Sequence, residues 1–232
     1  MKDSILGFPN LLLVIYLLLL WGGVRSIYAE QVTGQKTINF QWAFGAIKTS
    51  EGPGPQPVTR DTTLKTGDQI KFFLKIREKC FVYLLYRSSQ GELSVLFPFR
   101  FKQLKDEYDI SGNHYIPHGD QWFELDEQVG QEKFYLLASA TQLYQLETLI
   151  NAYESADAAK KLVLAERIIT DIHTLRKRHL KFKTYAERPV SIIGNMRGTE
   201  KASAVKTYDV AEFAVEISAD TFYSRTFTIE HQ

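Results

Sequence analysis

Apolar and polar residues alternate along much of the chain between residues 36 and 139. Residues 36–46 and 69–77 each carry an apolar set at every second position: Ile38, Phe40, Trp42 and Phe44, then Ile70, Phe72, Leu74 and Ile76. The positions in between are polar or small, with Phe73 as the exception. This period is typical of strands with one face in a core and the other in water. We expect two half-buried strands, separated by a loop over residues 49–62 whose prolines disfavour a ladder strand.

Residues 80–97 predict a β-hairpin. The first run is apolar on both faces, with Val82, Leu84 and Tyr86 opposite Phe81, Tyr83 and Leu85, so it reads as a central strand. Residues 88–91 form the turn, and the return strand directs Leu93, Val95 and Phe97 inward until Pro98 ends the pairing. An aromatic ligand platform is the competing hypothesis, but apolar residues at strand period favour a packed core.

Short strands over residues 115–117, 122–125 and 132–139 continue the antiparallel pattern, after which the period changes. Ser139 to Gln142 fits a capping box, and apolar residues then recur at helical spacing: Leu143, Leu146, Ile150 and Tyr153, followed by Leu162, Ala165, Ile169, Ile172 and Leu175. We expect a helical hairpin over residues 140–183, joined near 155–157, that docks on the sheet while its basic end projects past the sheet edge. A Gly-rich loop over residues 194–203 and strands over 208–218 and 222–230 complete the chain.

These elements predict a mainly β fold, an antiparallel β-sandwich-like domain with an added α-helical hairpin, which is an α+β arrangement. The N-terminus predicts export, because Lys2 precedes an apolar run over residues 11–24 and small residues at 26 and 29 offer cleavage positions. Residues 1–29 would be a signal peptide and residues 30–232 a single domain. If residues 5–24 form one apolar stretch, the segment could instead remain as a membrane anchor. Both alternatives place the domain outside the cytoplasm, in the periplasm or the extracellular space.

Charge excludes one large class of partner. Without residues 1–29 the chain loses Lys2, Arg25 and Asp3 from its 28 basic and 27 acidic residues, which leaves 26 of each. A domain with no net charge is a poor candidate for wholesale nucleic-acid binding, which requires a basic excess. Cys80 is the single cysteine and cannot form an intrachain disulfide, so we expect it to be a small buried hydrophobe.

Reactive motifs are few. The common hydrolase, zinc, redox and nucleotide-binding motifs are absent from the sequence, and no cofactor is expected. His114, His118 and Asp120 could bind Zn²⁺, although the two histidines lie about 13 Å apart on an extended segment unless the chain turns tightly at Pro117. A polar turn is the favoured interpretation, and an envelope hydrolase or metal-dependent enzyme using these residues is the alternative. One loop offers oxygen ligands for Ca²⁺: Asp106, Asp109, Ser111 and Asn113. Their spacing does not match a calcium-binding loop, so an exposed acidic turn is the favoured interpretation.

A basic run ends the second predicted helix. Arg176, Lys177, Arg178 and Lys181 could bind anionic lipid head groups or a glycan polymer. A solvated helix C-terminus, where the macrodipole favours cations, explains the same residues without a ligand. These four residues are nevertheless the binding candidates that the sequence offers.

One third of the chain carries recognisable motifs. They are Gly67-Asp68 at the start of a strand, Val82 to Leu84, Gly91, Leu96 to Pro98, Ile116 to Gly119, and Gly130 to Glu132 with Ala138 and Ser139. In this order they resemble the bacterial domain of unknown function 4384 over residues 64–139. The resemblance implies a bacterial source and an envelope-associated β-domain that accompanies other modules elsewhere, and it carries over no catalytic residues.

Together these observations predict an exported, non-enzymatic binding or assembly module of the bacterial cell envelope. Its partner would be an envelope protein or an anionic envelope surface, and it would meet the membrane only through an uncleaved N-terminal segment. A structural subunit whose partner covers an apolar patch is a further hypothesis.

Overall fold

The computed structural model describes residues 37–52, 54–77, 80–99, 111–180, 185–190 and 209–232. The predicted export segment, the Gly-rich loop over 194–203, Asp106, Asp109 and Lys181 lie outside these ranges. Within the described ranges, no helix combines the length and apolar character that a membrane crossing requires.

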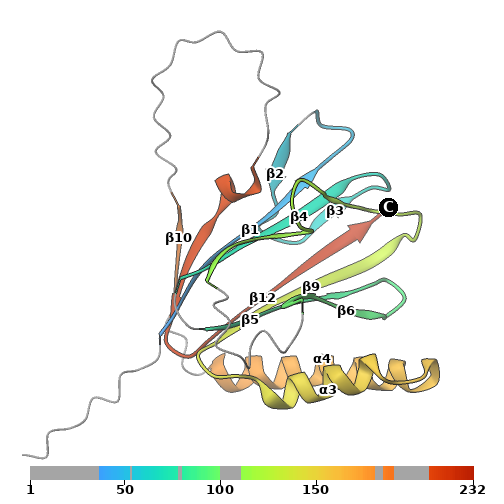
Figure 1. The fold of residues 1–232 in the computed structure, drawn as a ribbon. Coiled ribbons are helices and arrows are strands. Elements are labelled where there is room, and N and C mark those ends of the chain that lie inside the picture. Colours follow the sequence, from blue (N-terminus) through green and yellow to red (C-terminus); the bar gives the residue numbers. More distant parts are fainter. Residues whose placement is uncertain (1–36, 53, 78–79, 100–110, 181–184, 191–208) are drawn as a thin grey trace, which may run out of the picture. The chain divides into compact units, whose positions relative to one another are not determined.

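Two sheets form the main layers of the described part of the chain (Figure 1). The first sheet is antiparallel and has the order β10 (Tyr185–Pro189), β11 (Val215–Ala219), β1 (Ile38–Ile47), β4 (Gln69–Ile76) and β7 (Gly112–Ile116). Two short strands extend it, β2 (Pro55–Pro57) beside β1 and β8 (Phe123–Glu124) beside β4. The second sheet has the order β3 (Thr62–Leu64), β12 (Phe222–His231), β9 (Gly130–Ser139), β5 (Phe81–Arg87) and β6 (Leu93–Phe97).

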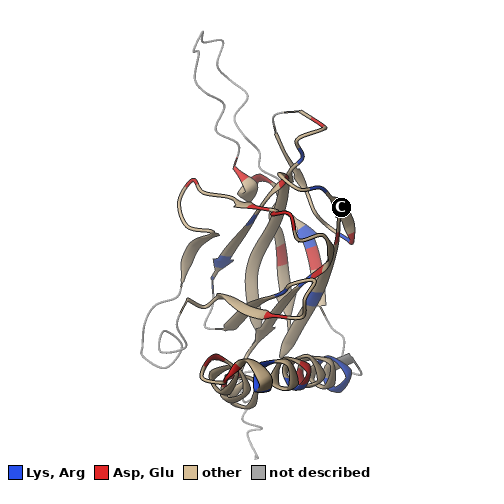
Figure 2. Ribbon diagram, turned by 90° about the vertical axis from the view of Figure 1, so that its right-hand side faces the viewer, with Lys and Arg blue, Asp and Glu red and all other residues tan. Residues whose placement is uncertain are grey.

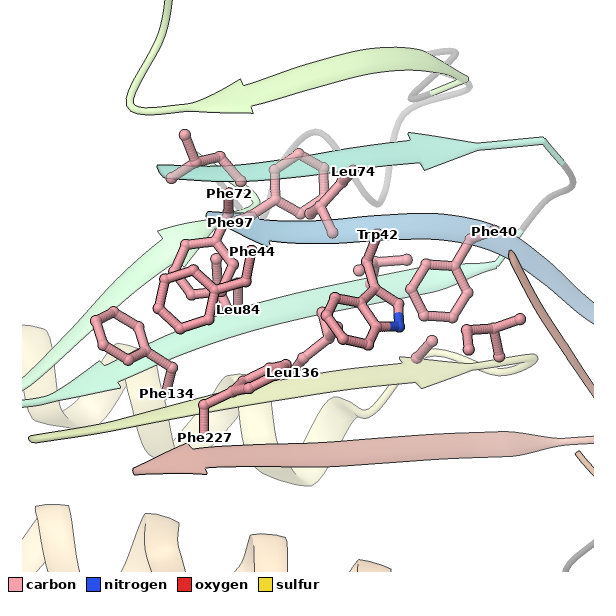
Figure 3. Close-up of a cluster of buried hydrophobic side chains, with 14 of the residues drawn as sticks. Phe40, Trp42, Phe44, Phe72, Leu74, Leu84, Phe97, Phe134, Leu136 and Phe227 are labelled. Carbon is pink, nitrogen blue, oxygen red and sulfur yellow. The ribbon is translucent and has the colours of Figure 1, made fainter. Parts of the chain in front are cut away.

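Aromatic side chains fill the space between the sheets (Figure 3). The Phe44 and Phe72 rings stack with centroids 3.9 Å apart, and Phe227 meets Trp42 edge-on at 5.2 Å. Leu84 on β5 is fully buried among them, as the strand pattern predicts. Such interdigitation of inward-facing residues from two sheets is the core of a β-sandwich, so the predicted fold class is confirmed.

A helical layer covers the outer face of the second sheet (Figures 1 and 2). It consists of α3 (Tyr144–Glu154) and α4 (Ala158–Leu180), whose buried residues pack on Tyr83, Leu85, Tyr135 and Leu137 of β5 and β9. Polar contacts fix the docking: the Tyr83 hydroxyl donates to Glu147 at 2.8 Å and accepts from the Leu143 N–H at 3.2 Å. This layer explains why β5 is apolar on both faces, and it confirms the predicted helical hairpin.

The prediction that β1 and β4 are half-buried is wrong. The 3₁₀ helix η1 (Val210–Phe213) covers their second face by packing on Ala43 and Phe73. Beside it, Lys71 on β4 is only 5% exposed; its ammonium group donates to the carbonyls of Gly119 and Gln121 and lies over the Tyr115 and Trp122 rings. Residues distant in sequence therefore shield a face that alternation alone assigns to water.

Two predicted boundaries also fail. Residues 210–213 are not strand but η1, because the Asp209 carboxylate accepts the Ala211 N–H and caps a 3₁₀ turn. β2 pairs with β1 inside the predicted loop, since prolines are tolerated on an edge strand where no neighbour needs their missing N–H. β10, whose residues are all exposed, carries no apolar period and was not predicted.

The helix start and the apolar stripe of α4 differ from the prediction as well. Ser139 is the last residue of β9 and its hydroxyl accepts from the Thr141 N–H, so the capping box is wrong and α3 begins at Tyr144 without a side-chain cap. Leu162 is 59% exposed, and the buried stripe of α4 passes through Ile168 instead.

The predicted hairpin places Leu93 and Phe97 on the same face of the return strand. In the structure Leu93 packs against the helices, whereas Phe97 faces the core between the sheets. The register between β5 and β6 shifts at Leu84/Leu85, and this bulge moves Phe97 to the other face.

Candidate functional site

A cleft of about 480 Å³ lies where the start of β12, the edge strand β10 and the last turns of α4 come together. Three arginines line it from three different parts of the chain: Arg60, Arg176 and Arg225. Asp61, Glu187 and Asp220 add carboxylates, and four rings complete the wall: His179, Tyr185, Phe222 and Tyr223. Its size and its convergent polar groups and rings make this cleft a candidate ligand site.

Arg225 and Glu187 form the floor of the cleft. The Arg225 guanidinium lies 3.1 Å from both Glu187 oxygens, donates to the Thr59 carbonyl, and lies 5.2 Å from the centre of the Trp42 ring. The Tyr223 hydroxyl also donates to Glu187 at 3.1 Å, and burial raises the pKa of this tyrosine. Because these charges satisfy one another, the floor is pre-organised and nearly neutral.

Arg176 and His179 form the wall that α4 contributes. The Arg176 Nη1 lies 3.5 Å from the Thr226 hydroxyl oxygen, at the limit of a hydrogen bond, and the His179 ring stacks on Phe222 with centroids 4.6 Å apart. Burial, with help from the charge of Arg178, lowers the pKa of His179, so this ring is neutral at pH 7. The positive charge on this wall therefore belongs to Arg176.

The predicted basic residues separate in the structure. Arg176 lines the cleft, Lys177 and Arg178 are exposed on the last turn of α4 and do not line it, and Lys181 lies outside the described residues. In the last described turn of α4, His179 packs on Phe222 at the start of β12, and residues 181–183 of the predicted basic end lie outside the described residues. Arg60 and Glu187 were missed because neither belongs to a local motif. Arg225 left a signal: it occupies a core-facing position between Tyr223 and Phe227.

The alternative site at His114, His118 and Asp120 has a different environment from the one that metal binding requires. The His114 ring lies 5.0 Å from Phe97 and the His118 ring stacks on Phe99 at 5.6 Å, while Asp120 is exposed in the following turn. Across the described part of the chain, no group of three or more His, Cys, Asp or Glu side chains could hold a metal ion.

A second polar cluster is buried at the other end of β12. His231 lies 3.2 Å from Glu132 through Nδ1 and 3.2 Å from the Thr66 hydroxyl through Nε2, and burial raises the pKa of Glu132. The order Thr-His-Glu is that of a nucleophile, base and acid. However, the Thr66 hydroxyl donates to the Asp126 carbonyl at 2.9 Å, so it accepts from the histidine rather than losing a proton to it. This cluster ties β12 to the turn before β4.

The recognisable motifs build turns. Gly67 has a φ of +85°, which favours glycine, and the next residue, Asp68, is buried. The Asp68 carboxylate accepts the Thr49 N–H at 2.8 Å, the Thr49 hydroxyl at 3.0 Å and the Lys65 N–H at 2.8 Å. Gly130 has a φ of +134°, and a Cβ there would lie 2.7 Å from the Cβ of Ser89. These motif residues therefore maintain the scaffold.

Comparison with known proteins identifies a family for part of the chain. Residues 63–142 match the model of the family described as Domain of unknown function (DUF4384). No curated protein and no solved structure matches the chain. Every residue that lines the cleft lies outside the matched segment. The segment from residue 63 to residue 142, with its Gly-Asp, Leu-Phe-Pro and Ile-Pro-x-Gly motifs, is thus of the DUF4384 family.

Proposed function

We propose that the chain is an exported, non-enzymatic binding module of the bacterial cell envelope and that it holds its partner in the cleft beside β12. The observation that carries the proposal is the position of Arg176. This predicted binding residue lies in a cleft with Arg60 and Arg225, beside aromatic rings. Support for export comes from the apolar N-terminal run after Lys2.

Two arginines of the cleft, Arg60 and Arg176, would attract an anionic group on the partner, and the carboxylates of Asp61 and Asp220 offset part of their charge. Arg225 is neutralised by Glu187, and Asp61 accepts the Thr228 N–H at 3.0 Å. By contrast, no carboxylate among the described residues forms an ion pair with Arg60 or Arg176. A guanidinium group without an ion pair can bind a carboxylate or phosphate through two parallel hydrogen bonds, and this attraction weakens as the salt concentration rises.

Chemistry on the partner is a weaker interpretation of the same cleft. The imidazole of His179, which lines the cleft, is stacked on Phe222. The cleft also has three hydroxyls, those of Thr221, Ser224 and Thr226, and none of them forms a hydrogen bond with the His179 ring. Nucleophilic catalysis requires a base within hydrogen-bond reach of the nucleophile. Recognition is therefore the function that these residues support best.

Retention on native envelope fractions tests the proposal. The protein carrying Arg176→Glu is compared with the wild type and with Arg167→Glu, which makes the same charge change on an exposed position of α4 away from the cleft. We expect Arg176→Glu alone to lower retention and its dependence on salt, and the co-purifying partner to be identified from the wild type. Equal loss in both variants would indicate a general effect of helix charge, and equal retention would exclude the cleft.

A further inference from the structure

Among the described residues, the strand at the cleft has an unpaired hydrogen-bonding edge. β12 pairs with β9 along its whole length, but β3 pairs on its other side only at Ile229, Glu230 and His231. Residues 222–228 of β12 have no strand on that side among the described residues, and the part from Phe222 to Thr226 lines the cleft. We propose that this edge binds an extended peptide segment of another polypeptide, one that carries an acidic side chain, by adding it as a strand beside β12. This inference rests on the proposed function and specifies its partner.

The direction of the backbone groups follows from the contacts near residue 232. Thr228 donates its N–H to Asp61, and Gln232 donates its N–H to the Leu64 carbonyl, both away from β9. On the β9 side, the Thr221 carbonyl accepts from the Ala140 N–H. Since alternate residues of a strand direct their N–H and C=O groups to opposite sides, Phe222, Ser224 and Thr226 direct theirs away from β9. Among the described residues, none of these outward groups has a hydrogen-bond partner.

The outward groups suit a short peptide. Phe222 and Thr226 are about 13 Å apart along the strand, so a segment of about five residues would span them. A neighbouring strand lies about 4.8 Å away, which places the segment within the cleft. Main-chain hydrogen bonds would supply affinity, and alternate side chains of the segment would supply specificity.

The positive charge of Arg176 favours an acidic side chain on the added peptide. On β12 the side chains of Phe222 and Thr226 face α4, because His179 stacks on the first and Arg176 reaches the second. Side chains of an added strand alternate in the same way, so one set faces α4 beside Thr226. A carboxylate at that position would meet the Arg176 guanidinium, which has no ion pair within the described residues.

Amide exchange of the free protein tests the edge before any peptide is chosen. We expect the N–H groups of Ser224 and Thr226 to exchange rapidly and those of Arg225 and Phe227, which face β9, to exchange slowly. If Ser224 and Thr226 are as slow as their neighbours, the edge is already occupied and the proposal is wrong.

A random octapeptide library displayed on phage supplies the probe. We expect selected peptides to contain an acidic residue and to protect the Ser224 and Thr226 amides when they bind. Ser224→Pro removes one outward N–H without touching the β9 ladder and should weaken binding about tenfold, the effect of one backbone hydrogen bond. Ser224→Thr keeps the amide and should bind as the wild type does. The melting temperatures of both variants show whether each is folded. If Ser224→Pro does not fold, the amide-exchange measurement on the wild type decides whether the edge is open.

Unchanged peptide binding by Ser224→Pro, or selection of no peptide, would overturn strand addition. Neither outcome touches the proposed function, which is judged by the retention of Arg176→Glu on envelope fractions. Conversely, peptides could bind the edge while Arg176→Glu leaves envelope retention unchanged. That result would support strand addition and contradict the proposed function.

Discussion

Asp68, the acidic residue of the Gly-Asp motif, offers a direct test of how the motif stabilises the fold. Asp68→Ala leaves the N–H groups of Thr49 and Lys65 without the carboxylate that accepts them. A lost partner costs about 1–3 kcal/mol when the group left behind is buried. Thr49 and Lys65 are exposed residues, so water can compensate in part and the lower end applies to each. We therefore expect the free energy of unfolding to fall by about 2 kcal/mol at pH 7.

The effect has a characteristic pH dependence. Burial alone would raise the pKa of Asp68, but hydrogen bonds from the Lys65 and Thr49 N–H groups and the Thr49 hydroxyl outweigh it and lower the pKa below its usual value of 3.8. A carboxylate with a lowered pKa stabilises the fold fully above its unfolded-state pKa, and this contribution disappears as pH falls through the folded-state pKa. Asp68→Asn lacks the contribution at every pH. The stability gap between the wild type and Asp68→Asn should therefore shrink below about pH 4.

Urea denaturation followed by tryptophan fluorescence at steps from pH 7 to pH 2 measures both effects, because Trp42 is buried in the core. Glu127→Gln, on an exposed residue outside the motif, is the control for a lost negative charge. A loss of less than about 0.5 kcal/mol at pH 7, the range of ordinary surface substitutions, would show that the motif does not act through this carboxylate. A gap that stays constant down to pH 2 would refute the pKa argument.

Three further predictions concern the core, the helical layer and export. Leu84→Ala should lower the free energy of unfolding by about 2–5 kcal/mol and Leu162→Ala by less than about 0.5 kcal/mol, because the first residue is fully buried and the second 59% exposed; urea denaturation of both variants checks this. Tyr83→Phe removes the hydroxyl that donates to Glu147 and should cost about 2 kcal/mol, with amide exchange accelerated in α3 more than in β4; equal acceleration in both would contradict a docking role. N-terminal sequencing of the native protein should begin near Glu30; an intact initiator methionine on membrane-bound protein would indicate an anchor, and a cytosolic location would contradict export.

The sequence predicts those elements whose environment is readable locally. β5 is apolar on both faces, which predicts a layer on each side, and the helical period after residue 143 provides one of them. The second face of β4 is different. Lys71 reads as a solvent-facing residue, yet carbonyls of Gly119 and Gln121 and two aromatic rings enclose it. Only the folded chain brings those groups to the lysine.

The candidate site was predictable only in part for the same reason. Arg176 stands in a conspicuous basic run, but the run does not distinguish it from Arg178, which faces elsewhere on the helix. Arg60 and Glu187 reach the cleft because β12 lies between β3 and β9 and because β10 pairs with β11. Pairings between strands so far apart in sequence leave no periodic trace, and so the cleft could not be read from the pattern.

The matched segment and the cleft occupy different parts of the chain, which matters for the proposed binding function. Strands β4 to β9 lie wholly within residues 63–142, but they form complete sheets only with β1 beside β4 and with β12 beside β9. β12 therefore has two roles: its core-facing residues close the sandwich, and its outer edge lines the cleft. Arg176, which like Arg60 has no ion pair among the described residues, belongs to the helical layer that follows the segment. Turn and core residues can thus maintain the DUF4384 scaffold, and if the cleft binds a partner as proposed, strands and helices outside the matched segment would determine which one. Substitutions at the cleft should then alter binding with little effect on the motifs.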